Sequence, residues 1–327
     1  MCGYIIRFAL AALCLGLLYH FGLLQFDALV ALYDRPAYVV ISGLLLFTTI
    51  PLHALRWHLL LWCQGFRLPF RKTLEVVLVG IFFNTFLPGS HGGDIVRAGY
   101  VYHGARQQTG TLLLSILVDR LTGLAGLIGL GLVAQLALPS VIDYRITIFM
   151  IAFAAATIIG SSLLPMLGRL VAAILERLGS RAGDRVLRLS MQVDTAFRIY
   201  VKRADILLAA VLISVLQFAV IFIALVVIAR AFDFVTASPV TIVYAGVISL
   251  IANSVPLTPG GIGVGEAAFA NAITLIDPSA IGPYATVFLA FRALTLVLSL
   301  LGGPVFLVYR SEIIEYTAEA QAHPEKS

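Results

Sequence analysis

Charged side chains are scarce in this chain of 327 residues, because Asp, Glu, Lys and Arg together make up only 12% of it. A soluble globular domain carries about 25% charged residues. Hydrophobic residues account for 60% of the chain, and it has no stretch long and polar enough to form an independent soluble domain. The composition therefore excludes an ordinary soluble enzyme and predicts an all-α polytopic integral membrane protein.

Cysteine is also scarce, and Cys2, Cys14 and Cys63 have no metal-ligand spacing. This excludes a disulfide framework and a zinc site. His91 and Asp94 supply only two metal-binding groups, so we expect no metal and no other cofactor. The net charge of +5 would favour nucleic acid in a soluble protein. In a membrane protein, basic loops that set the topology and contact anionic lipid explain it better.

Long apolar runs dominate instead, and they predict about six full transmembrane helices. A helix of about 20 apolar residues crosses the hydrocarbon core. A cleavable signal peptide is the alternative for the first run, which is long for that role. We expect one transmembrane domain over residues 1–310, followed by a polar tail over residues 311–327. The predicted spans cover residues 4–24, 38–63, 110–138, 146–167, 205–229 and 284–309.

Two further apolar regions are interrupted by proline and glycine. The run 73–87 meets Pro88-Gly89 and is followed by the short run 94–105. The run 240–252 meets a segment with two prolines and four glycines before the run 267–276. Proline lacks an N–H and glycine has a low helix propensity, so each region should contain a broken helix. These runs are too short to cross a bilayer alone, which predicts two re-entrant elements.

The two broken elements carry matching charges. A carboxylate follows each break, Asp94 in the first and Glu266 in the second. An arginine lies 26 residues further along in both cases, at Arg120 and Arg292. Matched broken helices in the two halves of a membrane protein are typical of transporters whose binding site lies between the halves.

Basic residues gather in alternate loops of the chain. The loops at 65–72, 103–109 and 168–204 are basic, whereas the other loops carry few bases. Because Lys and Arg in short loops mark the cytoplasmic side, both termini should be cytoplasmic in a protein of the cell inner membrane. The broken elements then enter from opposite faces, which predicts an inverted repeat of residues 38–138 and 205–310.

The connector at 168–204 is the longest polar segment and holds eight basic residues against three acids. Apolar residues recur at helical spacing from Leu167 to Leu178, which predicts a cytoplasmic amphipathic helix lying on the membrane. Binding to anionic headgroups is one interpretation of this segment. A solvated connector that fixes the topology is the other.

Several motifs resemble one family of membrane proteins. The runs Asn84-Thr-Phe-Leu-Pro-Gly-Ser-His-Gly-Gly-Asp-Ile-Val-Arg97 and Pro256-Leu-Thr-Pro-Gly-Gly-Ile-Gly-Val-Gly-Glu266 are similar to signatures of the lysylphosphatidylglycerol synthase transmembrane (flippase-like) family. His53-Ala-Leu-Arg-Trp57 and Val118-Asp-Arg120 resemble its secondary marks. The resemblance implies a lipid-translocating domain, as in the multiple peptide resistance factors, where it flips aminoacylated phosphatidylglycerol made by an attached soluble synthase. We expect that soluble domain to be absent here, because the polar tail is short.

Eight residues in or beside the broken elements and their neighbouring spans are the candidates for substrate binding. An ionisable group costs at least about 2.5–3.5 kcal/mol at the centre of a membrane helix, so its presence indicates a role. The charged candidates would contact a headgroup or a coupling proton, or they would pair and tie the broken elements to the bundle. The asparagines would satisfy freed backbone groups or touch a ligand. The candidates are Asn84, Asp94, Arg97, Arg120, Asn253, Glu266, Arg292 and Arg56.

Three classes of function fit these features. The first is a flippase or transporter that moves an amphiphilic (phospho)lipid or a lipid-linked headgroup, and it is the one we favour. The second is a membrane-embedded transferase with Asp94 or Glu266 as general base, although the chain has no nucleotide or metal motif. The third is a non-transporting lipid-binding partner of a lipid- or glycan-modifying enzyme. The expected partners are anionic or zwitterionic membrane lipids, a second copy of the chain, or such an enzyme, and not nucleic acid.

Overall fold

A computed structural model describes residues 12–86, 92–102, 109–136, 182–232, 234–254 and 261–308, together with the single residues 148, 151, 152, 155, 170 and 258. Both proline–glycine breaks, most of the predicted span 146–167 and the start of the first span lie outside the described residues. The predicted amphipathic segment of the connector, apart from Leu170, and the tail 311–327 also lie outside them.

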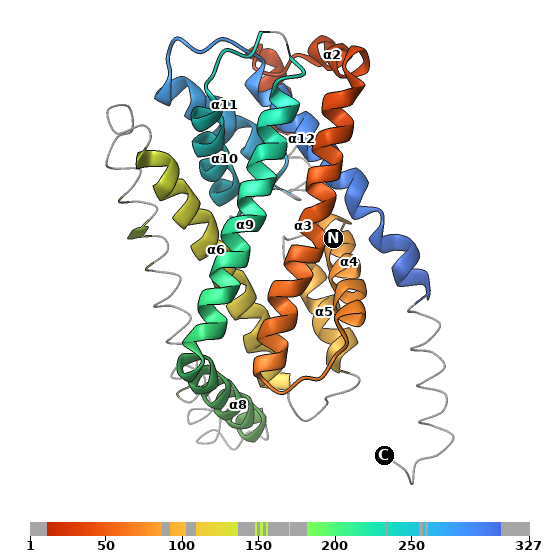
Figure 1. The fold of residues 1–327 in the computed structure, drawn as a ribbon, viewed down its shortest axis with the longest axis vertical. Helices are drawn as coiled ribbons and strands as arrows, with labels where there is room; N and C mark the ends of the chain where they lie inside the picture. The colour runs from red at the N-terminus through yellow and green to blue at the C-terminus, as the bar shows by residue number, and fades with distance from the viewer. Residues whose placement is uncertain are drawn as a thin grey trace.

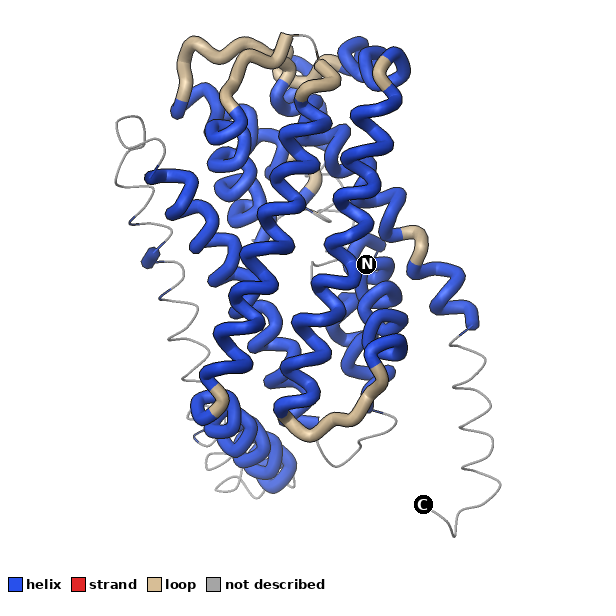
Figure 2. Tube along the Cα trace, viewed as in Figure 1, coloured by secondary structure: helices blue, strands red, loops and turns tan. Residues whose placement is uncertain are grey.

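Four helices are long and apolar enough to cross a membrane: α3 (Pro36–Cys63), α6 (Thr109–Leu136), α9 (Ala204–Ala229) and the run Tyr284–Val308, which begins with α12 (Tyr284–Ser299). They match four of the predicted spans, and residues 12–20 within the first predicted span are also helical. The described residues contain no strand, so the prediction of an all-α polytopic membrane protein is confirmed. Loops gather mainly at the two ends of the bundle (Figure 2).

Each predicted broken element is a pair of short helices. The first pair is α4 (Phe70–Phe86) and α5 (Gly92–Tyr102), and the second is α10 (Pro239–Ser254) and α11 (Val264–Ile276). The two helices of each pair pack on each other. Figure 1 shows α4 and α5 in the lower half of the molecule and α10 and α11 in the upper half.

Small residues allow close contact between helices. A Cβ added to Gly93 at the start of α5 would collide with the carbonyl oxygen of Gly80 on α4. On the other side of α4, the carbonyl of Leu78 leaves no room for a Cβ on Gly302, in the final helical segment. Glycine therefore lets α4 approach both its partner helix and the end of the second half.

The helix α9 joins the second half of the chain to the first. It runs alongside α3 and also packs on α6 (Figure 1). Ser42 Oγ on α3 donates a hydrogen bond to the carbonyl oxygen of Ala224 at 3.1 Å. Gly126 on α6 faces Ser214 on α9 with no room for a Cβ. The main core of buried apolar residues lies around the second half of α9 and around α10, α11 and α12, and it includes Phe269 and Phe288.

A polar helix, α8 (Ala182–Lys202), crosses the lower end of the bundle (Figure 1). The Tyr200 hydroxyl donates to the carbonyl oxygen of Leu60 at 3.0 Å, and Gln64 Nε2 donates to that of Ala196 at 2.9 Å. Burial raises the pKa of Tyr200, so its hydroxyl stays protonated and able to donate. The face of α8 that carries Ala196 and Tyr200 is therefore packed on the bundle.

The opposite end is closed by the short elements η1 (Phe26–Leu29) and α2 (Val30–Asp34) and by the loops that join the second-half helices. The backbone N–H of Gln25 donates to Thr286 Oγ1 at 2.8 Å. The backbone N–H of Ala237 donates to the Tyr284 hydroxyl at 3.1 Å. These bonds fasten the segment just before η1 and the α9–α10 loop to the start of α12.

Candidate functional site

Asp119 on α6 lies at the centre of the larger cluster of charges. Its side chain is 1% exposed, and Oδ1 accepts a hydrogen bond from Arg56 Nε at 2.8 Å. Its Oδ2 accepts from Arg97 Nη2 at 3.2 Å and lies 3.3 Å from His53 Nε2. Two guanidinium groups thus hold one buried carboxylate, and the charge-assisted hydrogen bonds offset part of the cost of removing these groups from water.

Asp94 on α5 extends this cluster. Arg97 Nη1 donates to Asp94 Oδ1 at 3.4 Å, and Arg120 reaches Oδ2 through Nε at 2.9 Å and Nη2 at 2.7 Å. The first matched pair of the sequence is therefore a direct ion pair. The charges alternate in the order Arg56, Asp119, Arg97, Asp94, Arg120, and we call these residues the five-charge chain. The Arg120 side chain is 41% exposed, whereas the other four are at most 9% exposed.

The helix α5 presents Asp94 and Arg97 on one face, because residues three apart are neighbours on a helix. Asn84 Oδ1 on α4 accepts a hydrogen bond from the Gly93 backbone N–H at 2.8 Å, which fastens the start of α5. The Arg97 guanidinium lies 4.0 Å from the centre of the Trp57 ring. Both side chains are almost completely buried, so this cation–π contact replaces water on one face of the arginine.

Arg56 connects the five-charge chain to the second half of the protein. Its Nη1 donates to Ser214 Oγ on α9 at 3.0 Å and lies 3.5 Å from Gln217 Oε1. Ser214 in turn donates to the carbonyl oxygen of Ala210 at 2.8 Å. Residues of α3, α5, α6 and α9 therefore meet in one polar network inside an otherwise apolar bundle.

Glu266 and Arg292 form the second charged pair. Arg292 Nε donates to Glu266 Oε1 at 2.6 Å, and Glu266 is fully buried. Glu266 Oε2 also accepts from the Gly263 backbone N–H at 2.7 Å, which caps the first turn of α11. Arg292 Nη2 donates to the carbonyl oxygen of Gly261 at 3.1 Å and lies 3.5 Å from Asn253 Oδ1. The pair contains one charge of each sign.

Two glycines that follow the second proline–glycine break permit this arrangement. Gly263 has a φ of +84°, in the left-handed region that favours glycine. A Cβ on Gly265 would lie 2.6 Å from both Arg292 Nη2 and Asn253 Oδ1. The repeated glycines therefore bring the backbone close to the charged pair.

A cavity of about 310 Å³, which we call the central cavity, lies beside the second pair. Its walls are mostly apolar and come from α3 and α4 of the first half and from α9, α10 and α12 of the second. Arg292 and Asn253 line it, and the Arg292 side chain is 17% exposed. The cavity can therefore accept an apolar chain next to a guanidinium and an amide.

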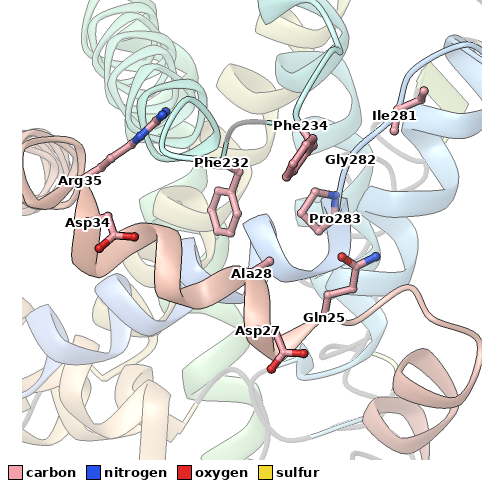
Figure 3. A pocket seen from close by; sticks show the side chains of 10 residues that line it. All are labelled: Gln25, Asp27, Ala28, Asp34, Arg35, Phe232, Phe234, Ile281, Gly282 and Pro283. Atoms are coloured by element: carbon pink, nitrogen blue, oxygen red, sulfur yellow. The ribbon is translucent and has the colours of Figure 1, made fainter.

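A second cavity, of about 650 Å³, lies at the end of the bundle that carries η1 and α2 (Figure 3). Gln25 and Ala28 line it on one side, and Phe232, Phe234 and Pro283 on the other. None of the eight candidate residues lines it. It is therefore separate from both charged clusters.

The structure divides the eight predicted residues into two groups. Asn84, Asp94, Arg97, Arg120 and Arg56 belong to or adjoin the five-charge chain, and Asn253, Glu266 and Arg292 form the second group. The members of the second group that line the central cavity are Asn253 and Arg292.

Sequence reasoning missed Asp119 as a site residue, although it lies in the quoted run Val118-Asp-Arg120. An acid inside an apolar span is a signal in its own right, because of the cost of placing it there. His53, Ser214 and Gln217 were also missed, since nothing in the sequence indicates that these helices meet at Arg56.

Both clusters combine guanidinium donors with carboxylate acceptors of the chain itself. Among the described residues, no group of three His, Cys, Asp or Glu side chains is arranged as metal ligands would be. Guanidinium groups dominate the five-charge chain, and they are donors with a planar geometry that suits carboxylate and phosphate.

Helices long and apolar enough to span a membrane, two pairs of short helices and buried charged side chains define a polytopic membrane protein with charged clusters inside an apolar bundle. The family model described as "Lysylphosphatidylglycerol synthase TM region" matches residues 4–303. The chain therefore belongs to this family of membrane domains linked to lipid handling, which confirms the resemblance seen in the sequence. No curated protein and no solved structure matches the chain.

Proposed function

We propose that this protein is a transporter that moves an amphiphilic phospholipid or lipid-linked headgroup across the membrane, and not an enzyme. The observation that carries the proposal is the central cavity, whose lining divides into mostly apolar walls and polar side chains that include Arg292 and Asn253. An amphiphile has the same division, with apolar chains attached to a polar headgroup. Membrane lipids are therefore the proposed ligands.

The arrangement of the interrupted helices supports movement as well as binding. The α4–α5 pair and the α10–α11 pair lie toward opposite ends of the molecule (Figure 1), which favours two re-entrant elements that enter from opposite faces. In the proposed inverted repeat, residues 38–138 and 205–310 rock against each other around the cavity. The cavity walls come from both halves, so such a movement would change access to it.

The roles within the second pair differ. Arg292 reaches the cavity, so it is the proposed headgroup contact. Glu266 is fully buried and holds Arg292 by a 2.6 Å hydrogen bond, so it is the proposed positioning residue. In the proposed orientation both termini are cytoplasmic, α8 lies on the cytoplasmic side of the inner membrane, and η1 and α2 lie on the other side.

A translocation assay with purified protein in liposomes tests the proposal. Arg292→Ala should abolish movement of a fluorescent phospholipid between leaflets, because the headgroup contact is lost. Glu266→Gln should also abolish it, because Arg292 loses its ionic partner. Both variants should still insert and remain monodisperse in detergent.

Three results would contradict the proposal, the first by excluding transport and the other two by excluding the proposed roles of Arg292 and Glu266. The first is a wild-type protein that binds lipid without moving it, which favours the non-transporting partner of an enzyme. The second is normal movement by Arg292→Ala. The third is aggregation of both single variants together with an active, stable protein when Glu266 and Arg292 are both replaced by apolar residues. That last result would make the two residues a structural pair only.

A further inference from the structure

An exposed tryptophan marks the end of the bundle where α3 stops and α9 starts. Trp62 is the second-last residue of α3 and is 42% exposed. Arg203 is the residue directly before α9. Both helices are long and apolar enough to span a membrane, so both residues lie where a span ends. Tryptophan is enriched at this level of membrane proteins, where its ring meets the lipid headgroups.

Two arginines contact the Trp62 ring. The Cζ atom of Arg67 lies 5.0 Å from the centre of the ring, and that of Arg203 lies 5.9 Å from it. Arg67 comes from the loop between α3 and α4, whereas Arg203 comes from the turn between α8 and α9, at the lower end of the molecule (Figure 1). Cation–π contacts help to hold both guanidinium groups at one ring. We call Trp62, Arg67 and Arg203 the corner site.

The guanidinium groups of the corner site are suited to phosphate. Asp205 accepts hydrogen bonds from Nε and Nη2 of Arg203, both at 3.0 Å, and so occupies one edge of that group. A guanidinium has a second edge, formed by Nη1 and Nη2. Arg67 is exposed, and arginine can contact an aromatic ring while its N–H groups bind oxygen atoms. Two parallel hydrogen bonds to a phosphate are typical of arginine.

Exposed apolar side chains lead from the corner site along the two spans. Leu55 lies two helical turns before Trp62 on the same face of α3 and is 38% exposed. On α9, Leu208 and Leu212 share one face and are 62% and 60% exposed. Because α3 and α9 pack on each other, a lipid with its headgroup at the corner site can lay its chains against both helices.

The charge around the corner site favours an anionic headgroup. Lys202 is exposed and directly precedes Arg203, so it adds a further ammonium group beside the carboxylate of Asp205. Basic residues next to a span attract anionic lipids, and each base strengthens binding about fivefold. The ammonium group of a zwitterionic headgroup gains nothing from the same bases.

We infer that the corner site binds a net anionic phospholipid from the leaflet at the α8 end, with the lipid phosphate held by Arg67 and Arg203. No residue of the corner site lines the central cavity, so this lipid is separate from the one that the proposed transporter moves. The inference goes beyond the proposed function and does not depend on it. The bound lipid connects the α3–α4 loop to the α8–α9 turn, and a ligand that binds only the folded protein stabilises it.

A titration of the delipidated, full-length protein in neutral detergent tests the inference. Short-chain phosphatidylglycerol and phosphatidylethanolamine are added separately, bound lipid is counted by native mass spectrometry, and the thermal midpoint is followed in parallel. Phosphatidylglycerol should bind about fivefold or more tightly and should raise the midpoint further. Equal binding of the two lipids would contradict the inference.

Two substitutions remove different parts of the corner site. Arg67→Gln should weaken the binding of phosphatidylglycerol about fivefold, because one base is lost. Trp62→Leu keeps an apolar side chain but removes the ring that holds both arginines, so it should also weaken binding. Both positions are exposed, so both variants should stay monodisperse in detergent. Wild-type affinity in Arg67→Gln would overturn the inference whatever the behaviour of Trp62→Leu.

The matched control is Arg230→Gln. Arg230 is exposed and follows the last residue of α9, so this substitution makes the same change in net charge at the other end of the same span. It should keep the wild-type affinity for phosphatidylglycerol. An equal loss in Arg230→Gln and Arg67→Gln would show a response to overall charge and would rule out the corner site.

Inorganic phosphate separates a lipid site from a site for the free ion. At the concentrations at which phosphatidylglycerol raises the thermal midpoint, phosphate alone should leave it unchanged. An equal rise would assign the corner site to free phosphate and overturn the inference. Because binding is measured without a bilayer, a protein that moves no lipid can still confirm the corner site, and one that moves lipid can still refute it.

Discussion

The substitution Asp119→Asn measures how strongly the five-charge chain holds α3, α5 and α6 together. It keeps the shape of the side chain and removes one negative charge that is 1% exposed. Arg56 then keeps Ser214 and Gln217 as neutral partners, while Arg97 keeps Asp94.

The expected loss of stability follows from the burial of the two arginines that Asp119 contacts. The side chains of Arg56 and Arg97 are 7% and 2% exposed, so water replaces little of the lost interaction. Breaking a buried ion pair by removing one partner costs about 3–5 kcal/mol. We expect a loss within this range for Asp119→Asn, because Arg56 loses a carboxylate at 2.8 Å and Arg97 loses one of two.

The assay is the temperature at which half of the detergent-solubilised protein remains monodisperse by size-exclusion chromatography. Asp194→Asn on α8 is the matched control, since Asp194 pairs at 3.2 Å with Arg198, whose side chain is 71% exposed. Exposed pairs of this kind contribute about 0–1 kcal/mol, so the control should keep the wild-type midpoint. Equal midpoints for Asp119→Asn, the control and the wild type would refute the estimate from burial.

The remaining predictions concern topology and the packing of the first broken element. In a background without native cysteines, Ser279→Cys should react with an impermeant maleimide on intact cells, and Thr195→Cys should react only after lysis. The reason is that the loop before α12 and the helix α8 lie at opposite ends of the molecule. The reverse labelling would contradict the proposed orientation. Gly93→Ala should lower the thermal midpoint and abolish lipid movement, because the added Cβ would collide with the Gly80 carbonyl oxygen. Gly99→Ala is the control, since a Cβ at this position of the same helix meets open space. A Gly93→Ala protein with an unchanged midpoint and unchanged lipid movement would contradict the close packing of α4 and α5.

Hydropathy and helix-breaking residues predicted the four long apolar helices and the two pairs of short helices that the structure describes. The predicted spans 38–63 and 205–229 agree with Pro36–Cys63 and Ala204–Ala229 to within about two residues. The agreement has a physical reason, since an apolar run of this length in a membrane protein must satisfy its own backbone groups as a helix.

The contacts between helices were much harder to predict. Nothing in the local sequence indicates that α9 delivers Ser214 and Gln217 to Arg56, because these residues lie about 160 positions apart and meet only through the packing of α3 on α9. Trp57 belongs to a motif that the sequence showed, but its cation–π contact with Arg97 depends on how α3 packs against α5. Spacing along a chain gives the neighbours on one helix and not those across helices.

The matched 26-residue spacing is the exception, and the geometry of the fold explains it. In the first half, eight residues of α5 lead from Asp94 to the loop, and eleven residues of α6 lead from Thr109 back to Arg120. In the second half, ten residues of α11 lead from Glu266 to the loop, and eight residues of α12 lead from Tyr284 to Arg292. In each half, the helix segment before the loop and the one after it therefore differ in length by no more than about one helical turn. Each arginine returns close to the level of its carboxylate, and its long side chain covers the remaining difference. Helix segments of nearly equal length thus turn a regular spacing in the sequence into a contact in space, and in both halves the structure has the ion pairing that was one of the two alternatives predicted from the sequence.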